Sequence, residues 1–408
     1  MSDRRSRLVA LLVLFVAVGA ALAGGWLVTA AIDLPTGPED YNLVQWEVRH
    51  FSDKWLYEVG TLLRGGPDEA EKTRRLERFL ALNAEIASLE QQAAQISWGN
   101  SPIFEELAAA RRERDQLENT VEAVLEERVA RVSKEAGLES SFPFFPRVRW
   151  LFPPVDFEFA APANVLASSP RDRIYLESTR LLKSDLSLED IEKVERRCEA
   201  KGVSALVVGV GGVGTYPSAV PFDADYGHLL ETVAHEWLHQ YLFFRPLGSR
   251  YFRGPALATI NETVADMAGS ELGALAAERY PLSAGLPAGQ AGAGEAPTPN
   301  PEIDFDQVMR ELRREVDGLL AEGKVAEAES LMEERRQFLA DHGYFIRRIN
   351  QAYFAFHGLY ATTSASSSPI GPKLEELRRR SDSLGDFIHT AARITSEADL
   401  DRLLAGGG

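Results

Sequence analysis

Apolar residues recur at helical spacing along most of this chain and alternate over a shorter stretch near its middle. Residues 41–140 are dominated by the helical period, which Gly65-Gly66-Pro67 and Gly99-Asn100-Ser101-Pro102 interrupt. These breaks predict one shorter helix followed by two long ones, arranged as a helical hairpin or a short coiled coil. Its apolar stripes can serve packing within the chain or the assembly of a homo-oligomer.

Residues 142–280 show a different pattern, in which short strands precede a strongly apolar helix. Phe142 to Pro146 ends the helical period, and a further helix is expected over about residues 186–201. Strands are predicted over residues 147–151, 155–160, 173–176 and 204–210. We expect them to form a small mixed or antiparallel sheet beside the apolar helix.

The last part of the chain is again helical, after a linker over residues 281–303 that is rich in Ala, Gly and Pro. Residues 304–408 form the predicted α-helical C-terminal lobe. It holds two amphipathic helices broken near Gly323, a third over residues 344–360, and shorter helices near residues 373–380, 384–395 and 397–404.

The first 33 residues contain a long uncharged stretch. Leu8 to Ile32 holds 25 residues without a charge, and three arginines precede it. This length and this flank predict a transmembrane anchor, so that the chain is a single-pass protein of the cell membrane with everything after Asp33 extracytoplasmic. A cleaved signal peptide is the alternative, because Ala21-Leu22-Ala23 resembles a cleavage site.

Composition and charge narrow the class of protein. Of 408 residues, 45% are hydrophobic and 26% are charged, as in a folded protein with a sizeable core. The formal net charge of −17 argues against a nucleic-acid partner, which normally requires a basic face. The single cysteine, Cys198, excludes an internal disulfide.

One short segment has side chains at the spacing that the binding of one metal ion requires. His235, Glu236 and His239 make the pattern HExxH, and residues four apart lie on one face of an α-helix. Both imidazoles can therefore bind one Zn²⁺, which takes a tetrahedral ligand set with one position left for water. Glu236 is then placed to accept a proton from that water. Because five-residue matches also arise by chance, a third ligand is needed elsewhere in the chain.

The segment Asn261-Glu262-Thr263-Val264-Ala265-Asp266 follows on a second helical pattern, which runs from about Ala256 to Tyr280. Together with HExxH it resembles the gluzincin metallopeptidases, the thermolysin-like zincins, in which NExx(A/S)D stands on a later helix. The resemblance implies that Glu262 is the third zinc ligand and that Asp266 orients a zinc-binding histidine, here His235. It also implies an upstream edge strand that pairs with extended substrate, for which residues 208–219 are the candidate by position.

Pattern and resemblance together predict an α+β fold. A transmembrane helix (1–33) and a helical hairpin stalk (41–140) precede a zincin-like metallopeptidase domain (142–280), and the linker and the helical lobe follow. The expected function is that of a membrane-anchored, extracytoplasmic zinc metallopeptidase acting on a peptide or protein substrate. Glu236 is the expected general base.

The resemblance further implies a Tyr or His of the C-terminal lobe that donates to the oxyanion of the transition state. Tyr353 and His357 are the candidates we favour, and Tyr344 and Tyr360 are the others. Two other functions stay open. One is a non-proteolytic zinc-binding domain that binds peptides or cell-wall components, and the other is a helical membrane scaffold with a chance HExxH.

A glycine-rich segment near the predicted edge strand spells GxGxxG, from Gly209 to Gly214. No helix is predicted directly behind it, because Pro217 and Pro221 follow, so a dinucleotide fingerprint is disfavoured. We interpret these glycines as permitting the close approach of another backbone.

Overall fold

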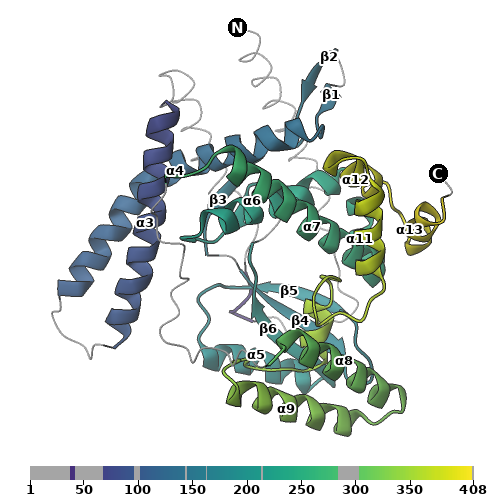
Figure 1. Cartoon of the computed structure of the whole chain (residues 1–408). Coiled ribbons are helices and arrows are strands. Elements are labelled where there is room, and N and C mark those ends of the chain that lie inside the picture. Colours follow the sequence, from purple (N-terminus) through teal and green to yellow (C-terminus); the bar gives the residue numbers. More distant parts are fainter. Residues whose placement is uncertain are drawn as a thin grey trace.

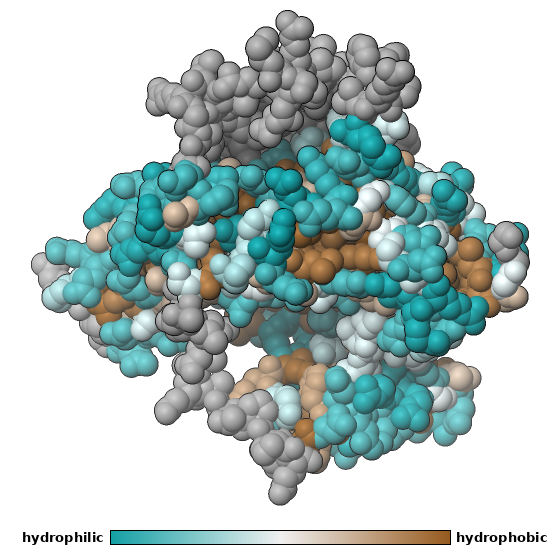
Figure 2. All heavy atoms as spheres, turned by 45° about the horizontal axis from the view of Figure 1, so that its top comes forward, coloured by the Kyte–Doolittle hydropathy of each residue, from teal (hydrophilic) through white to brown (hydrophobic). Residues whose placement is uncertain are grey.

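The computed structural model describes residues 37–41, 68–95, 102–142, 145–161, 163–212, 215–283 and 303–406. Long helices fill the upper body in the view of Figure 1, and a three-stranded sheet with further helices fills the lower lobe. Figure 2 shows apolar residues across the middle of one face, beside a hollow between a larger and a smaller mass. The described chain is thus a mixed helix-and-sheet fold in which helices dominate.

Two long helices, α3 (Glu69–Ala94) and α4 (Pro102–Glu135), form a hairpin. Both bury apolar side chains in the same core as α6 (Tyr226–Phe243) and α7 (Pro255–Arg279). These side chains are Leu76, Phe79 and Leu80 of α3, and Val121, Val124, Leu125 and Val129 of α4. The predicted helical hairpin is therefore present over the described residues, and its apolar stripes also pack against helices of the body.

The described strands form three small sheets. β4 (Asn164–Pro170) lies between β5 (Ser178–Leu182) and β6 (Val203–Gly209) in an antiparallel sheet. β3 (Phe157–Phe159) pairs in parallel with β7 (Ser218–Val220), and β1 (Ser140–Phe142) pairs antiparallel with β2 (Phe145–Trp150). The strand predicted over residues 173–176 is wrong, since residues 171–177 connect β4 to β5.

One helix covers the three-stranded sheet and gives it a core of its own. The helix α5 (Leu188–Glu199) begins at Ser187, whose hydroxyl accepts a hydrogen bond from the backbone N–H of Asp190 at 3.2 Å. Val194 and Cys198 of α5 are buried against Leu166, Ala205 and Val207 of the sheet. The single cysteine is therefore a packing residue.

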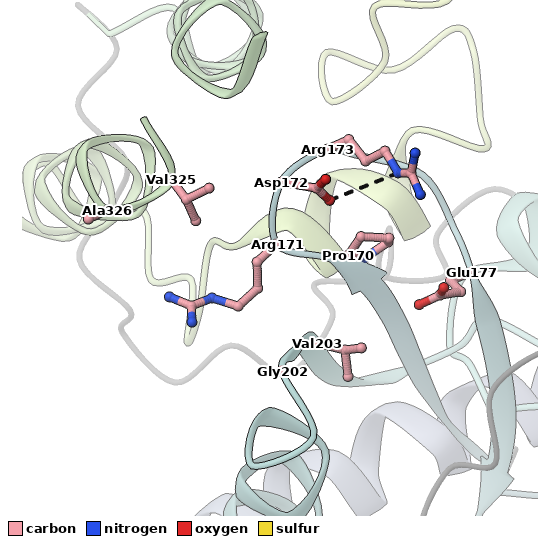
Figure 3. Close-up of a pocket in the computed structure, with 9 residues that line it drawn as sticks. All are labelled: Pro170, Arg171, Asp172, Arg173, Glu177, Gly202, Val203, Val325 and Ala326. Atoms are coloured by element: carbon pink, nitrogen blue, oxygen red, sulfur yellow. Dashed lines mark ion pairs between the residues drawn. The ribbon is translucent and has the colours of Figure 1, made fainter. Parts of the chain in front are cut away.

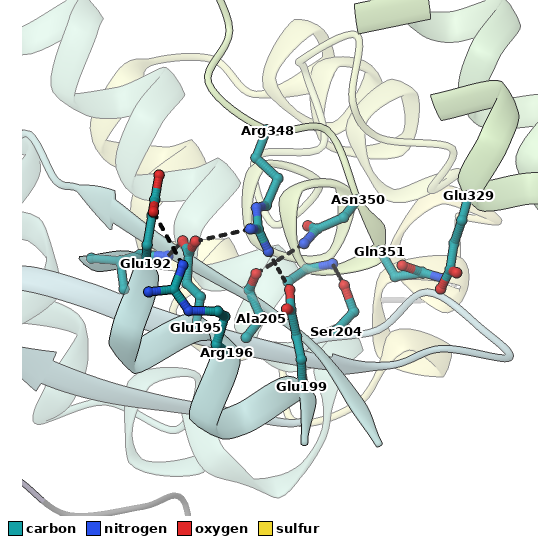
Figure 4. A network of polar contacts seen from close by, with 12 residues as sticks. Glu192, Glu195, Arg196, Glu199, Ser204, Ala205, Glu329, Arg348, Asn350 and Gln351 are labelled. Carbon is teal, nitrogen blue, oxygen red and sulfur yellow. Dashed lines mark hydrogen bonds and ion pairs between the residues drawn. The ribbon is translucent and has the colours of Figure 1, made fainter. Parts of the chain in front are cut away.

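The C-terminal lobe begins with α8 (Phe305–Ala321) and α9 (Val325–Asp341), separated by Gly323 as expected. The third helix, predicted over residues 344–360, is only α10 (Gln351–His357), because Asn350 caps it by accepting a hydrogen bond from the backbone N–H of Tyr353 at 2.9 Å. The residues before α10 bind the sheet instead. Figure 4 shows Arg348 directed at Glu195 and Glu199 of α5, and Asn350 donating to the carbonyl of Ala205 on β6.

The shorter helices expected near the end of the chain are confirmed as α11 (Ile370–Arg380), α12 (Leu384–Ala391) and α13 (Glu397–Leu404). They return to the upper body, where Leu374, Leu377, Phe387 and Ile388 join the core that contains α7. Arg378 of α11 also forms a bidentate pair with Glu271 of α7, at 2.6 and 2.9 Å. The C-terminal lobe therefore contacts the upper body through α11, α12 and α13.

Two glycines let α6 and α7 cross at very short range. A Cβ atom built on Gly269 lies 2.9 Å from Cα of His235, and one built on Gly273 lies 2.7 Å from Cα of Glu231. Real Cβ atoms do not come so close to a backbone, so any larger residue at either position would push the helices apart. The spacing of four residues places both glycines on one face of α7.

The expected membrane anchor is corrected. Across the part of the chain that the structure describes, no helix is both long enough and apolar enough to cross a membrane. The longest described helices, α3 and α4, carry Glu and Arg along their length. The predicted spanning segment, Leu8 to Ile32, lies outside the described residues. Because no described helix can cross a membrane, the expectation of a single-pass membrane protein with an extracytoplasmic catalytic domain is withdrawn.

Candidate metal centre

The centre is built on α6, which is buried over most of its circumference. The helix begins at Asp225, whose carboxylate accepts a hydrogen bond from the backbone N–H of His228 at 2.8 Å. Trp237 is fully buried, and its indole N–H donates to the carbonyl of Pro153 at 3.0 Å. With the apolar faces packed, His235 and His239 lie on the remaining face and keep their rings partly exposed.

The helix α7 brings Glu262 to the two histidines. The Nε2 atoms of His235 and His239 are 3.0 Å apart, and Oε2 of Glu262 lies 3.3 Å from Nε2 of His239 and 4.0 Å from Nε2 of His235. Tetrahedral bonds of about 2.0–2.1 Å to a zinc ion place neighbouring ligand atoms about 3.4 Å apart. The three separations between ligand atoms lie on either side of this value. His235, His239 and Glu262 therefore form a cluster that can bind a metal ion.

Each ligand is held by a further contact. Nδ1 of His239 lies 2.9 Å from Oδ1 of Asn261, and His235 hydrogen-bonds to the backbone of Ala265. The hydroxyl of Tyr251 donates to Oε1 of Glu262 at 2.6 Å, which leaves Oε2 directed at the histidines. Such contacts fix the orientation of a metal ligand and, for histidine, the tautomer.

Asp266 does not have the place that the resemblance implied. Its carboxylate accepts a hydrogen bond from the hydroxyl of Thr362 at 3.2 Å, and burial raises its pKa above the usual value. The contact to His235 is made instead by the backbone of Ala265, one residue earlier on α7. Asp266 thus connects α7 to the loop after α10.

Burial and mutual charge shift the pKa values of the three ligand residues. Burial, and then the neighbouring His239, lowers the pKa of His235 to about 4. Burial alone would lower the pKa of His239, but the negative charge of Glu262 raises it to about 9. Burial opposes ionisation of Glu262 as well, yet His239 lowers its pKa to about 2. The opposite shifts reflect the attraction between His239 and Glu262, whose Nε2 and Oε2 atoms lie 3.3 Å apart.

Glu236 lies beside the ligands and is not one of them. It follows His235 on α6 and is 6% exposed. Burial raises the pKa of Glu236 to about 7, and the negative charge of Glu262 acts in the same direction. A carboxyl group with this pKa can both accept and return a proton near neutral pH.

The two favoured donors from the C-terminal lobe do not lie at the cluster. Tyr353 packs against the core of α8 and α9, and its ring contacts are with Phe354 and His357. Tyr360 is the lobe residue that reaches the site, since its ring lies 6.2 Å from that of His235 and its hydroxyl hydrogen-bonds to Glu262. Burial raises the pKa of Tyr360 far above the usual value, so it keeps its proton.

Sequence reasoning missed Tyr251 altogether. This residue stands on η2 (Gly248–Arg253), a short turn of helix between α6 and α7. A Cβ atom on Gly248 would lie 2.3 Å from the backbone of Leu242, so the chain folds back closely on the end of α6 there. The only signal in the sequence is a Tyr and a Gly in the short connection between the two motif helices.

A pocket elsewhere on the molecule contains none of these residues. It is open to solvent and lies between the β4–β5 connection and the start of α9 (Figure 3). Its arginines have carboxylate partners nearby, because Arg171 pairs with Glu329 at 2.5 Å and Arg173 lies 3.9 Å from Asp172. We assign it no role.

Comparisons with known proteins add no family to this description. A scan against protein-family models, a search of curated proteins and a search of solved structures each found no match to this chain. The geometry of the metal cluster is therefore the ground on which a function is proposed.

Proposed function

We propose that this protein is a zinc-dependent metallopeptidase of the gluzincin kind. The observation that supports the proposal is the convergence of three ligand atoms from α6 and α7 on one point, with the buried carboxyl group of Glu236 beside them. Two imidazole nitrogens and one carboxylate oxygen make the ligand set of several catalytic zinc sites, which keep a fourth position for water or substrate. His235, His239 and Glu262 would hold the ion.

A bound zinc ion supplies a Lewis acid, which polarises a peptide carbonyl and makes a water molecule more acidic. The protein supplies the proton transfers. Glu236 accepts a proton from the attacking water at its carboxylate and returns it to the nitrogen of the departing amine. The position of Glu236, buried beside the three ligand residues, suits both steps.

Tyr360 supplies a hydrogen bond to the oxygen that becomes negatively charged when the carbonyl is attacked. Burial raises the pKa of its hydroxyl far above the usual value, and the hydroxyl already lies against Glu262 at the cluster. A fixed donor in a buried site lowers the energy of the transition state more than it lowers that of the substrate. Tyr360 therefore takes the role first expected of Tyr353 or His357.

The test measures zinc content and hydrolysis of a peptide library on the same preparations. His239→Ala and Glu262→Ala are expected to lose the metal, whereas Glu236→Gln is expected to keep one zinc per chain and lose hydrolysis. His228→Ala and Glu231→Gln are the matched controls, because both residues lie on α6 outside the ligand set. Hydrolysis by Glu236→Gln at the wild-type rate would rule out the proposed role of Glu236. A wild-type protein that binds zinc but cleaves no peptide would instead favour a zinc-dependent binding domain.

A further inference from the structure

The glycine-rich segment at the end of β6 lies directly against Glu236, and this contact indicates a role for the segment. We propose that Gly212 is a positioning residue, whose backbone lies directly against the carboxyl group of Glu236 and holds it in place. The proposal rests on the peptidase function, because it concerns the residue that positions the general base. For Gly212 it also replaces the interpretation that the glycine permits close approach of another backbone, since the nearest atoms belong to a side chain.

The space beside Gly212 is already filled by Glu236. A Cβ atom built on Gly212 would lie 2.3 Å from Oε1, 2.6 Å from Cδ and 2.8 Å from Cγ of Glu236. Contacts below 3.0 Å are not found for real Cβ atoms, so no other residue fits at position 212 while Glu236 keeps its position. Gly212 therefore bounds the carboxyl group on one side.

The chain around Gly212 is held on both sides by hydrogen bonds. Before it, β6 pairs with β4 as far as Gly209, which lies opposite Asn164. After it, the side-chain amide of Gln240 donates to the carbonyl of Thr215 at 2.5 Å and to the hydroxyl of Ser218 at 2.7 Å. Gln240 is buried and lies one turn after Glu236 on the same face of α6. The helix that carries the general base therefore also anchors the chain that bounds it.

A methyl group at position 212 should act on catalysis more than on folding. Its collision partner is the flexible side chain of Glu236, which can rotate away without a change of backbone. Gly212 is not among the glycines with positive φ, so its backbone does not itself require glycine. A displacement of about 1 Å at a reacting group can lower a rate by about 100-fold.

The experiment compares Gly212→Ala with Gly211→Ala. Gly211 is the matched control, because no described atom lies within 4 Å of a Cβ atom built there. We expect Gly212→Ala to lower kcat by about 10- to 100-fold with KM and zinc content nearly unchanged, and Gly211→Ala to leave all three unchanged. In a Glu236→Asp background, where the side chain is shorter, Gly212→Ala should lower kcat much less. Equal losses of kcat in the two glycine variants, or fully additive effects with Glu236→Asp, would overturn the proposal.

A second readout does not depend on activity. In crystal structures of the two metal-free variants, the carboxyl group of Glu236 should move by about 1 Å or more in Gly212→Ala and stay in place in Gly211→Ala. An unmoved carboxyl group in Gly212→Ala overturns the proposal whether or not the protein hydrolyses peptides. A wild-type protein that binds zinc without hydrolysis would remove the proposed function alone, and the structural comparison would still decide the role of Gly212.

Discussion

Removing the hydroxyl of Tyr251 is a sensitive test of how the metal ligands are held. Tyr251→Phe deletes one oxygen atom and the hydrogen bond of 2.6 Å to Oε1 of Glu262. This length is typical of a bond from a hydroxyl group to an ionised carboxylate, which is among the stronger hydrogen bonds in proteins. Burial raises the pKa of Tyr251 well above its usual value, so the hydroxyl remains a donor at neutral pH.

The expected size of the effect follows from this geometry. Losing a contact that orients a metal ligand typically lowers metal affinity by about 10- to 100-fold, or about 1.4–2.7 kcal/mol. We expect the upper half of this range, because the bond is short and the Glu262 side chain is only 11% exposed. Tyr360 also bonds to Glu262, so the carboxylate stays in the site and binding is weakened, not abolished.

The assay is a zinc titration in competition with a chromophoric chelator, at fixed pH and ionic strength. Tyr175→Phe is the matched control, because its hydroxyl also donates to a carboxylate, that of Glu177, at 3.4 Å and away from the metal cluster. The dissociation constant of this control should equal that of the wild type. If Tyr251→Phe also binds zinc within threefold of the wild type, Tyr251 does not hold Glu262 for the metal and the reasoning is refuted.

Two further predictions concern stability. Gly273→Ala should lower the free energy of unfolding by about 1–3 kcal/mol in urea titrations, because its methyl group would meet the backbone of Glu231 at 2.7 Å. Gly318→Ala on α8, where no described atom lies within 4 Å, should be neutral or stabilising by up to about 1 kcal/mol; equal losses would contradict the close crossing of α6 and α7. Burial, and then the negative charge of Glu122, raises the pKa of Glu118 from 4.5 to about 7, so the folded state binds the extra proton. The contribution of Glu118 to the free energy of unfolding is therefore fully present below pH 4.5 and is lost as pH rises through 7, by on the order of 1 kcal/mol after allowance for solvent screening. Glu118→Gln should flatten the dependence of stability on pH between pH 5 and 8. An unchanged dependence would exclude this cause.

The sequence predicts the local part of the candidate site and not the contacts that complete it. The spacing of His235 and His239 is a property of one helix, so it could be predicted without a fold. Glu262 was expected only from the resemblance, because its place depends on how two helices cross, and the spacing of Gly269 and Gly273 does not say which helix they face. Tyr251 and Tyr360 come from a short turn and a loop, and neither position shows a periodic pattern.

The errors in the predicted fold have similar causes. The strand β4 was not predicted, because serines and a proline interrupt its apolar pattern. In the sheet, the hydroxyl groups of Ser168 and Ser178 are 2.8 Å apart and bond to each other, so polar side chains are buried without an unpaired group. The helix predicted over residues 344–360 fails because side chains before α10 bind α5 and β6, a long-range contact that outweighs helical spacing.

The close crossing of α6 and α7 also bears on which cations the centre can accept. Two ligands stand on one helix and the third stands on the other, so the close crossing of the helices brings the three ligand residues together. An ion such as Ca²⁺, which prefers six to eight oxygen atoms at about 2.3–2.6 Å, finds only one carboxylate among the three ligand residues. The spacing of the ligand set therefore depends on two glycines that are not part of it.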